Sequence, residues 1–377
     1  MSSTPGAATP ATATRFEAYQ RAGRQPGIRN RVLVLPSVIC SHMVADRIAA
    51  QVPAAVSAPH DHGCAQIGAD NDQTKAAFLG VATNPNIAGT VVVGLGCEVL
   101  QSDMVAAELA DLDVPVRELS IQGTGGTEPC IEAGVAAAQD LVRDAESTAH
   151  ASAGPGDLTI GVVASDLRDA TTGEAEPVIG DLVRTVTDAG GRVVVAGNER
   201  LSPHAEDVVD RAATDAVAAD LRALLARHAD RPAKMTRLRQ AAAETDFDAL
   251  TRAWGGLPVT GVLDYGERAT HESGLAVVDA PSQFEEAATA LAAAGAQVIV
   301  HATADGIPTG HPIAPVVKVS GDPETVAALP DDIDVDATTT DGDALVRRVL
   351  AVADGEESCA ERHGLAEFAI TRVGPSM

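Results

Sequence analysis

The 377-residue chain contains very few aromatic side chains and very few lysines. Aromatic residues make up 2% of the sequence, so a hydrophobic core has to be built from Val, Ala, Leu and Ile. The only lysines are Lys75, Lys234 and Lys318, whereas Asp and Glu together number 53 and the net charge is −26. Because nucleic acids and anionic membranes bind positively charged surfaces, this balance argues against both as partners. An acid-rich, lysine-poor composition is typical of a salt-rich cytoplasm, and we expect a halophilic protein.

Long apolar runs and closely spaced cysteines are also missing. No apolar run approaches the roughly 18 residues of a membrane-spanning helix. Residues 1–14 have neither the charged nor the apolar region of a signal peptide, so we expect a disordered tail and a cytoplasmic protein. No cysteines form a CxxC spacing or a close pair, which predicts reduced thiols in place of a disulfide framework. The five cysteines are Cys40, Cys64, Cys97, Cys130 and Cys359.

Two segments alternate β-branched apolar runs with helical patterns, separated by residues 145–157, a stretch rich in Ala, Ser, Gly and Pro that we interpret as a linker. This alternation predicts an α/β fold of two Rossmann-like units with mainly parallel sheets and crossover helices, over residues 15–144 and 158–377. The first unit has predicted strands near 32–36, 54–58, 90–95 and 115–121 and helices near 43–51, 68–82, 103–110 and 131–143. The second has predicted strands near 158–163, 193–196, 259–264, 275–279, 297–301 and 316–320 and helices near 178–188, 205–227, 233–253, 283–294 and 342–353.

Reactive side chains follow all four strands of the first unit. The segment from Pro59 to Gln66 places two imidazoles, a carboxylate, a thiol and an amide after the second strand. Because the carboxyl ends of parallel strands share one edge of a sheet, we expect one site there. The alternative is that the histidines are ordinary loop residues and that Cys40 and Cys97 are buried small side chains. The other strands are followed by Ser37, Cys40, Ser41 and His42, by Cys97, Glu98 and Gln101, and by Gln122 with Gly123 to Thr127.

Imidazole, thiolate and carboxylate together suit a borderline divalent metal such as Fe²⁺, Mn²⁺ or Zn²⁺, and Fe²⁺ or Mn²⁺ is our expectation. Such a metal acidifies the proton beside the carboxylate of a bound hydroxy acid, which a His or Glu can then remove. We predict His62, Cys64 and Cys97 as metal ligands. The predicted catalytic residues are His60, His62, Glu98 and Gln66.

The glycine-rich run from Gly123 to Thr127 opens a predicted helix and could bind a substrate carboxylate through its backbone amides. Gly94, Leu95 and Gly96 lack the third glycine of a dinucleotide fingerprint, so no dinucleotide cofactor is expected. Arg24, Arg29 and Lys318 are candidates for clamping a carboxylate; the alternative for each is solvated surface charge. The predicted substrate-binding residues are Arg29, Ser41, Gln122, Gly125, Gly126, Thr127 and Lys318.

These motifs resemble the altronate and galactarate dehydratases and their sulfolactate sulfo-lyase relatives. The resemblance implies the large, catalytic part of a metal-dependent hydro-lyase that converts a sugar acid, an aldonate or aldarate, into a 2-keto-3-deoxy acid. The matching elements are Gly23 and Arg24, Gly27 to Asn30, Pro36 to Ser41, Pro59 to Gln66, Asn84 to Gly89, Gly94 to Glu98 with Gln101, Ile121 and Gln122 with Gly125 to Thr127, Gly306 to Gly310, Pro315 to Ser320, Ile333 to Asp336, and Glu361 to Phe368.

The family's small N-terminal lobe, an SAF-type domain, is not recognisable, so the resemblance implies a separate small subunit and an oligomer. Ala164 to Arg168 stand where the family shows a Cys-Gly-Gly-Ser-Asp-like element, and residues 230–254 lack a family segment rich in Gly, Thr and Glu. Two alternatives therefore remain. One is a large subunit that releases sulfite from 3-sulfolactate, and the other is a non-catalytic acid-binding paralogue or assembly subunit.

Overall fold

The computed structural model describes residues 15–229 and 235–374, so the predicted tail at 1–14 lies outside the described residues. The N-terminal unit is a four-stranded parallel sheet of order β3-β2-β4-β5. Every predicted strand and helix of this unit is present. The strands are β2 (Arg31–Pro36), β3 (Ala55–Ser57), β4 (Ile87–Gly94) and β5 (Val116–Ser120), and the helices are α1 (His42–Ala49), α2 (Ala69–Ala82), α3 (Ser102–Asp111) and α4 (Thr127–Glu146).

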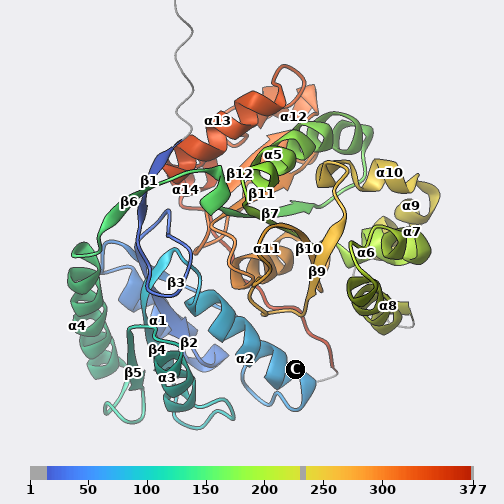
Figure 1. Ribbon diagram of the computed structural model, residues 1–377. Coiled ribbons are helices and arrows are strands. Elements are labelled where there is room, and N and C mark those ends of the chain that lie inside the picture. Colours follow the sequence, from blue (N-terminus) through green and yellow to red (C-terminus); the bar gives the residue numbers. More distant parts are fainter. Residues whose placement is uncertain (1–14, 230–234, 375–377) are drawn as a thin grey trace, which may run out of the picture.

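The C-terminal unit is a seven-stranded parallel sheet of order β13-β12-β11-β7-β8-β10-β9. The prediction of two α/β units with parallel sheets is confirmed (Figure 1). Its strands are β7 (Thr159–Ala164), β8 (Arg192–Val195), β9 (Val259–Leu263), β10 (Gly274–Val278), β11 (Val298–Ala302), β12 (Val316–Ser320) and β13 (Val335–Asp336). Its helices are α5 (Glu176–Asp188), α6 (Asn198–Leu201), α7 (Ala205–Asp210), α8 (Asp215–Ala229), α9 (Thr236–Glu244), α10 (Phe247–Leu250), α11 (Phe284–Ala293), α12 (Pro323–Ala328), α13 (Gly342–Ala353) and α14 (Cys359–His363).

Three strands were not predicted. The two-residue β13 lies at the edge of the large sheet beside β12. The other two, β1 (Phe16–Tyr19) and β6 (His150–Ala153), pair antiparallel as a separate ribbon. β6 lies inside the segment 145–157 that the sequence analysis interprets as a linker. Its sequence, His-Ala-Ser-Ala, contains no β-branched residue, so its pairing depends on β1 rather than on its own strand preference. The predicted helix at 233–253 begins in residues that are not described and is otherwise broken into α9 and α10.

The two units share one interior, because α2 packs on α11 and side chains of both sheets join one buried cluster. Small residues permit this close approach: a Cβ on Gly80 of α2 would lie 2.7 Å from the Cβ of Ala293 on α11. The Asn84 amide donates to the carbonyls of Ala292 at 2.7 Å and Ala296 at 2.9 Å. Buried polar groups are normally hydrogen-bonded, and these two bonds join the N-terminal unit to the segment around α11.

The C-terminal segment returns to the first unit and ends beside α2 (Figure 1). The carboxylate of Asp70 on α2 accepts hydrogen bonds from the backbone N–H groups of Val373 and Gly374, both at 2.8 Å. Arg372 forms an ion pair with Asp61 at 2.6 Å. The last residues described therefore buttress the loop that carries the His/Cys motif.

Candidate functional site

The loops after β2, β3 and β4 interlock at one edge of the small sheet, as the sequence predicts. The backbone N–H of Ile39 donates to the carbonyl of His62 at 2.8 Å, and the hydroxyl of Ser37 donates to the Glu98 carboxylate at 2.8 Å. A Cβ on Gly63 would lie 2.6 Å from the carbonyl oxygen of Ser37, so only glycine permits this approach. These contacts join the three loops into one platform.

His60 is part of the interior of this platform. Its Nδ1 accepts a hydrogen bond from the backbone N–H of His62 at 3.1 Å, and its Nε2 donates to the carbonyl of Pro36 at 2.7 Å. Burial lowers the pKa of His60 to about 4, so the ring is neutral at physiological pH. Both ring nitrogens are used, and the ring packs 4.9 Å from that of Phe78. In this structure His60 holds the loop.

His62 is 1% exposed and is held in the same way. Its Nε2 donates to the carbonyl of Ile370 at 2.9 Å, which leaves Nδ1 as the acceptor facing the side chains of Gln66 and Thr74. The hydroxyl of Thr74 donates in turn to the Gln66 side-chain oxygen at 2.9 Å. Burial lowers the pKa of His62 despite the nearby carboxylate of Asp61. His62 and Gln66 thus belong to a closed network with no ring nitrogen directed to solvent.

Glu98 is also mostly buried, with 6% of its surface exposed. Burial raises its pKa, but hydrogen bonds from the backbone N–H groups of Gly96 and Cys97 and from the Ser37 hydroxyl outweigh burial, so the pKa is lowered overall. The backbone N–H groups of Gly96 and Cys97 lie 2.7 and 2.9 Å from one carboxylate oxygen. Glu98 is therefore an ionised anchor for the β4 loop.

Three thiols lie on the outside of this platform. Cys40, Cys64 and Cys97 are exposed, whereas Cys130 and Cys359 are buried, so the alternative reading of Cys40 and Cys97 as buried small residues is wrong. Partial burial and the neighbouring thiols of Cys64 and Cys97 raise the pKa of Cys40, and Cys40 and Cys64 are within hydrogen-bonding reach of each other. The histidines of the motif, His60 and His62, are therefore buried, whereas the three thiols are exposed to solvent.

The structure does not bring the predicted ligands of a single metal ion into one group. Among residues 15–229 and 235–374, no three His, Cys, Asp or Glu side chains form a group that could hold one metal ion. For His62 to join Cys64 and Cys97, its ring would have to leave the Ile370 carbonyl and the Gln66 amide. His62 is thus engaged elsewhere, and an Fe²⁺ or Mn²⁺ ion bound by these three residues stays a prediction.

Several of the predicted substrate-binding residues of the small sheet already form hydrogen bonds within the protein. Ser41 is fully buried and its hydroxyl contacts the carbonyls of Val38 and Val93. The side chain of Gln122 lies against Gly96. The backbone N–H groups of Gly123, Thr124, Gly125 and Gly126 all donate inside their own loop, at 2.8–3.4 Å, with Gly125 and Gly126 at positive φ. Thr127 then begins α4, so these four amides form a turn rather than an open anion-binding nest.

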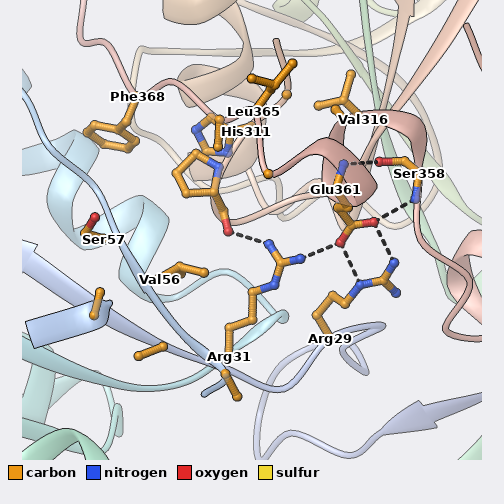
Figure 2. A pocket seen from close by; sticks show the side chains of 18 of the residues that line it. Arg29, Arg31, Val56, Ser57, His311, Val316, Ser358, Glu361, Leu365 and Phe368 are labelled. Atoms are coloured by element: carbon orange, nitrogen blue, oxygen red, sulfur yellow. Dashed lines mark hydrogen bonds and ion pairs between the residues drawn. The ribbon is translucent and has the colours of Figure 1, made fainter. Parts of the chain in front are cut away.

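Arg29 lies away from this edge, in a cavity of about 840 Å³ between the two units. Figure 2 shows Arg29 and Arg31 turned toward Glu361, whose carboxylate binds both guanidinium groups. Arg29 also donates to the carbonyls of Val352 and Glu356, both at 2.8 Å. Its charge and donors are thus satisfied by the protein, and in this structure Arg29 joins the two units.

Lys318 lies at a second location, inside the large sheet, and is fully buried. Its ammonium lies 3.1 Å from Nδ1 of His301 and 4.1 Å from the centre of the Phe284 ring. Nε2 of His301 lies 2.7 Å from the hydroxyl of Ser165, at the end of β7. Burial lowers the pKa of Lys318 to about 7 and that of His301 well below its usual range. Sequence reasoning missed this chain of side-chain contacts from Ser165 through His301 to Lys318, since only Lys318 stood out in the sequence.

Comparison with protein families shows which family this chain belongs to. Residues 18–146 match the second domain of D-galactarate dehydratase/altronate hydrolase, and residues 250–376 match the D-galactarate/altronate dehydratase C-terminal domain. The chain belongs to this family. The match covers the thiol-bearing unit and most of the large sheet, and it confirms the resemblance found in the sequence.

Three named relatives align with almost the whole chain. The (2R)-sulfolactate sulfo-lyase subunit beta of Chromohalobacter salexigens is 27% identical over 95% of this chain and 97% of its own length. The altronate dehydratases of Bacillus subtilis and Escherichia coli are 25% and 26% identical, over 96% and 95% of this chain and 78% of their own lengths. None of the helices in the described part of the chain is long and apolar enough to cross a membrane.

Proposed function

We propose that this chain is the large subunit of a lyase that removes water from a sugar acid, an aldonate or aldarate, to give a 2-keto-3-deoxy acid. The observation that carries the proposal is the match to both catalytic-part domains of a dehydratase family, together with a reactive edge built by three adjacent loops. Two relatives are named altronate dehydratase. The family's chemistry is therefore our first assignment for this chain.

The reaction removes the proton on C2 and the hydroxyl on C3, after which the enol becomes the ketone. It needs a base with a free lone pair at the exposed side of the platform. Nδ1 of His42 contacts the carbonyl of Ile39, which assigns the ring proton to Nδ1 and leaves Nε2 as the accepting nitrogen. We assign proton removal to His42 Nε2. His60, His62, Gln66 and Glu98 then act as positioning residues that keep the loops in place.

A second candidate is the elimination of sulfite from 3-sulfolactate. It is favoured by the sulfo-lyase subunit, of which this chain spans 97%, against 78% of the altronate dehydratases. The proton-removal step is the same in both reactions, and only the leaving group on C3 differs. The acid-rich composition is compatible with either assignment.

We also propose that a separate small SAF-type subunit covers the thiol-bearing edge. Each of the three cysteines is followed within three residues by an exposed large apolar side chain: Met43 is 67% exposed, Ile67 73% and Val99 58%. Apolar side chains gathered on one face in this way are typical of an interface. The sulfo-lyase relative is named as a subunit, which supports an assembly of more than one chain.

The experiment is an elimination assay in high salt. The purified chain, with and without a co-expressed small subunit, is incubated with a panel of aldonates, aldarates and 3-sulfolactate, and 2-keto acid and sulfite are measured. We expect 2-keto acid without sulfite from one sugar acid, and its loss in His42→Gln but not in His204→Gln. Sulfite from sulfolactate would select the second candidate. No product from any substrate, with the complex assembled, would favour the non-catalytic paralogue.

A further inference from the structure

The three exposed thiols come from three neighbouring strands. β2 lies between β3 and β4 in the small sheet, and the cysteines follow the carboxyl ends of these strands: Cys40 after β2, Cys64 after β3 and Cys97 after β4. Topology therefore brings them to one edge, and the interlocked loops hold them there. The loops of Cys40 and Cys64 are joined by the hydrogen bond from the Ile39 N–H to the His62 carbonyl, and the loops of Cys40 and Cys97 by the bond from Ser37 to Glu98. The remaining cysteines, Cys130 and Cys359, are buried elsewhere.

Apart from His42, whose Nε2 is assigned above to proton removal, the imidazoles and the Glu98 carboxylate of the same loops are committed to the protein. The rings of His60 and His62 use both nitrogens in hydrogen bonds, and the Glu98 carboxylate is held by backbone N–H groups and Ser37. A single Fe²⁺ or Mn²⁺ ion would draw on such nitrogen and oxygen ligands. With His42 assigned to proton removal, the groups left for a metal centre on this platform are the three exposed sulfurs.

Sulfur ligands that converge without meeting at one atom suit a cluster better than a single ion. In an iron–sulfur cluster each thiolate binds a different iron, so the sulfurs surround the cluster instead of one atom. This reconciles three neighbouring thiols with the lack of a single-ion group among the described residues. We propose that Cys40, Cys64 and Cys97 bind a four-iron, four-sulfide cluster that has one iron without a cysteine ligand.

The surroundings of the thiols agree with this assignment. Met43, Ile67 and Val99 are exposed apolar side chains that follow Cys40, Cys64 and Cys97 within three residues, and together they are called the apolar rim here. A hydrophobic shell limits the access of solvent to a metal centre and tunes its potential. The proposal does not depend on the proposed function, because the ligand set stands whether or not the chain turns over a substrate. If the proposed function holds, the iron without a cysteine faces the edge where the hydroxy acid binds.

Assembly of the cluster on the three thiols needs no added oxidant. Equal amounts of ferrous and ferric iron, with one sulfide per iron, supply the common oxidation state of the cluster. Each of the three thiols loses one proton as its Sγ–Fe bond forms. The full chain, in molar salt and without oxygen, is treated with these salts after complete reduction of its thiols. Iron and acid-labile sulfide are then counted, and the absorption and electron paramagnetic resonance spectra are recorded before and after dithionite reduction.

We expect about four irons and about four sulfides per chain, with a broad absorption band in the visible range. Cys40→Ser, Cys64→Ser and Cys97→Ser should each lose most of the band and of the bound sulfide. Cys130→Ala and Cys359→Ala are the matched controls and should keep both. Circular dichroism and thermal unfolding of the unloaded variants separate a lost ligand from a lost fold, because exposed thiols can be replaced at little cost in stability.

Three results would overturn the proposal: iron or zinc bound without sulfide, a cluster unaffected by all three exposed-thiol replacements, or a well-folded wild-type chain that binds no iron under these conditions. Each readout is independent of turnover. A chain that binds the cluster but fails the elimination assay would refute the proposed function alone, and an active chain without a cluster would refute this inference alone.

Discussion

The carboxyl edges of the two parallel sheets place their polar side chains in opposite ways. At the small sheet, the histidines and the Glu98 carboxylate are internal and the thiols are exposed. At the large sheet, Lys318 and His301 are fully buried, and only Ser165 at the end of their chain is partly exposed. Residue type thus marks both edges in the sequence, but burial decides which groups can meet a ligand.

This difference predicts opposite sensitivities to mutation. The large-sheet edge depends on packing around Phe284, whose ring lies 4.3 Å from that of His301. Phe284→Ala would remove a side chain that is 1% exposed, and we expect the free energy of unfolding to fall by about 3–5 kcal/mol. Met43→Ala, on the exposed rim, is the control and should change stability by less than about 0.5 kcal/mol. Denaturant unfolding measures both, and equal losses would contradict the comparison.

The buried Lys318 should make the large-sheet edge pH-sensitive. Its pKa of about 7 lies below its usual value of 10.5, so the unfolded chain binds more protons between these pH values. The free energy of unfolding should therefore rise from pH 7 to pH 10.5, by up to several kcal/mol, and this contribution should be smallest below pH 7. Lys318→Met should flatten the rise.

The measurement is denaturant unfolding at several pH values, with Lys75→Met as the control. Lys75 is half-buried at the surface and pairs with Glu108, so its replacement should leave the pH dependence unchanged. If the free energy of unfolding changed with pH in the same way in wild type and Lys318→Met, Lys318 would not be the source of the pH dependence.

At the small-sheet edge, the largest loss should come from the internal network. Ser37 is fully buried and donates to the ionised Glu98 at 2.8 Å. Ser37→Ala should lower the free energy of unfolding by about 1.5–3 kcal/mol, because hydrogen bonds to charged groups contribute that much. Ser147→Ala, at an exposed hydroxyl near the end of α4, is the control and should have little effect. A loss no larger than that of the control would mean that Glu98 does not anchor the loops.

The fold was largely predictable because most strands and helices have a strong periodic pattern. β2 and β4 are buried β-branched runs, which identify parallel strands without any knowledge of their partners. β1 and β6 were missed because each is stabilised by the other across more than a hundred residues. Local sequence carries no signal for such a pair.

That the loops after β2, β3 and β4 meet at one edge was predictable, but which of their side chains are buried was not. The order of strands and reactive residues located the edge at Cys40, Cys64 and Cys97. Which side chains face outward depends on loop geometry, such as the contact of Gly63 with Ser37, which periodicity does not encode. Arg29 and Lys318 were expected to bind a carboxylate, yet their partners, Glu361 and His301, are distant in sequence. Burial of a charge by distant segments is not visible in a local motif.

The smallest expected effect concerns Ser165, the partly exposed end of the large-sheet chain. Its hydroxyl lies 2.7 Å from Nε2 of His301, and water can replace it because Ser165 is not fully buried. Ser165→Ala should therefore lower the free energy of unfolding by only about 0.5–1.5 kcal/mol, less than Ser37→Ala. The ¹⁵N chemical shifts of His301 should nevertheless change, since its hydrogen-bond partner is altered. Unaltered His301 shifts, or a loss as large as that of Ser37→Ala, would show that the two edges do not differ in the way that burial predicts.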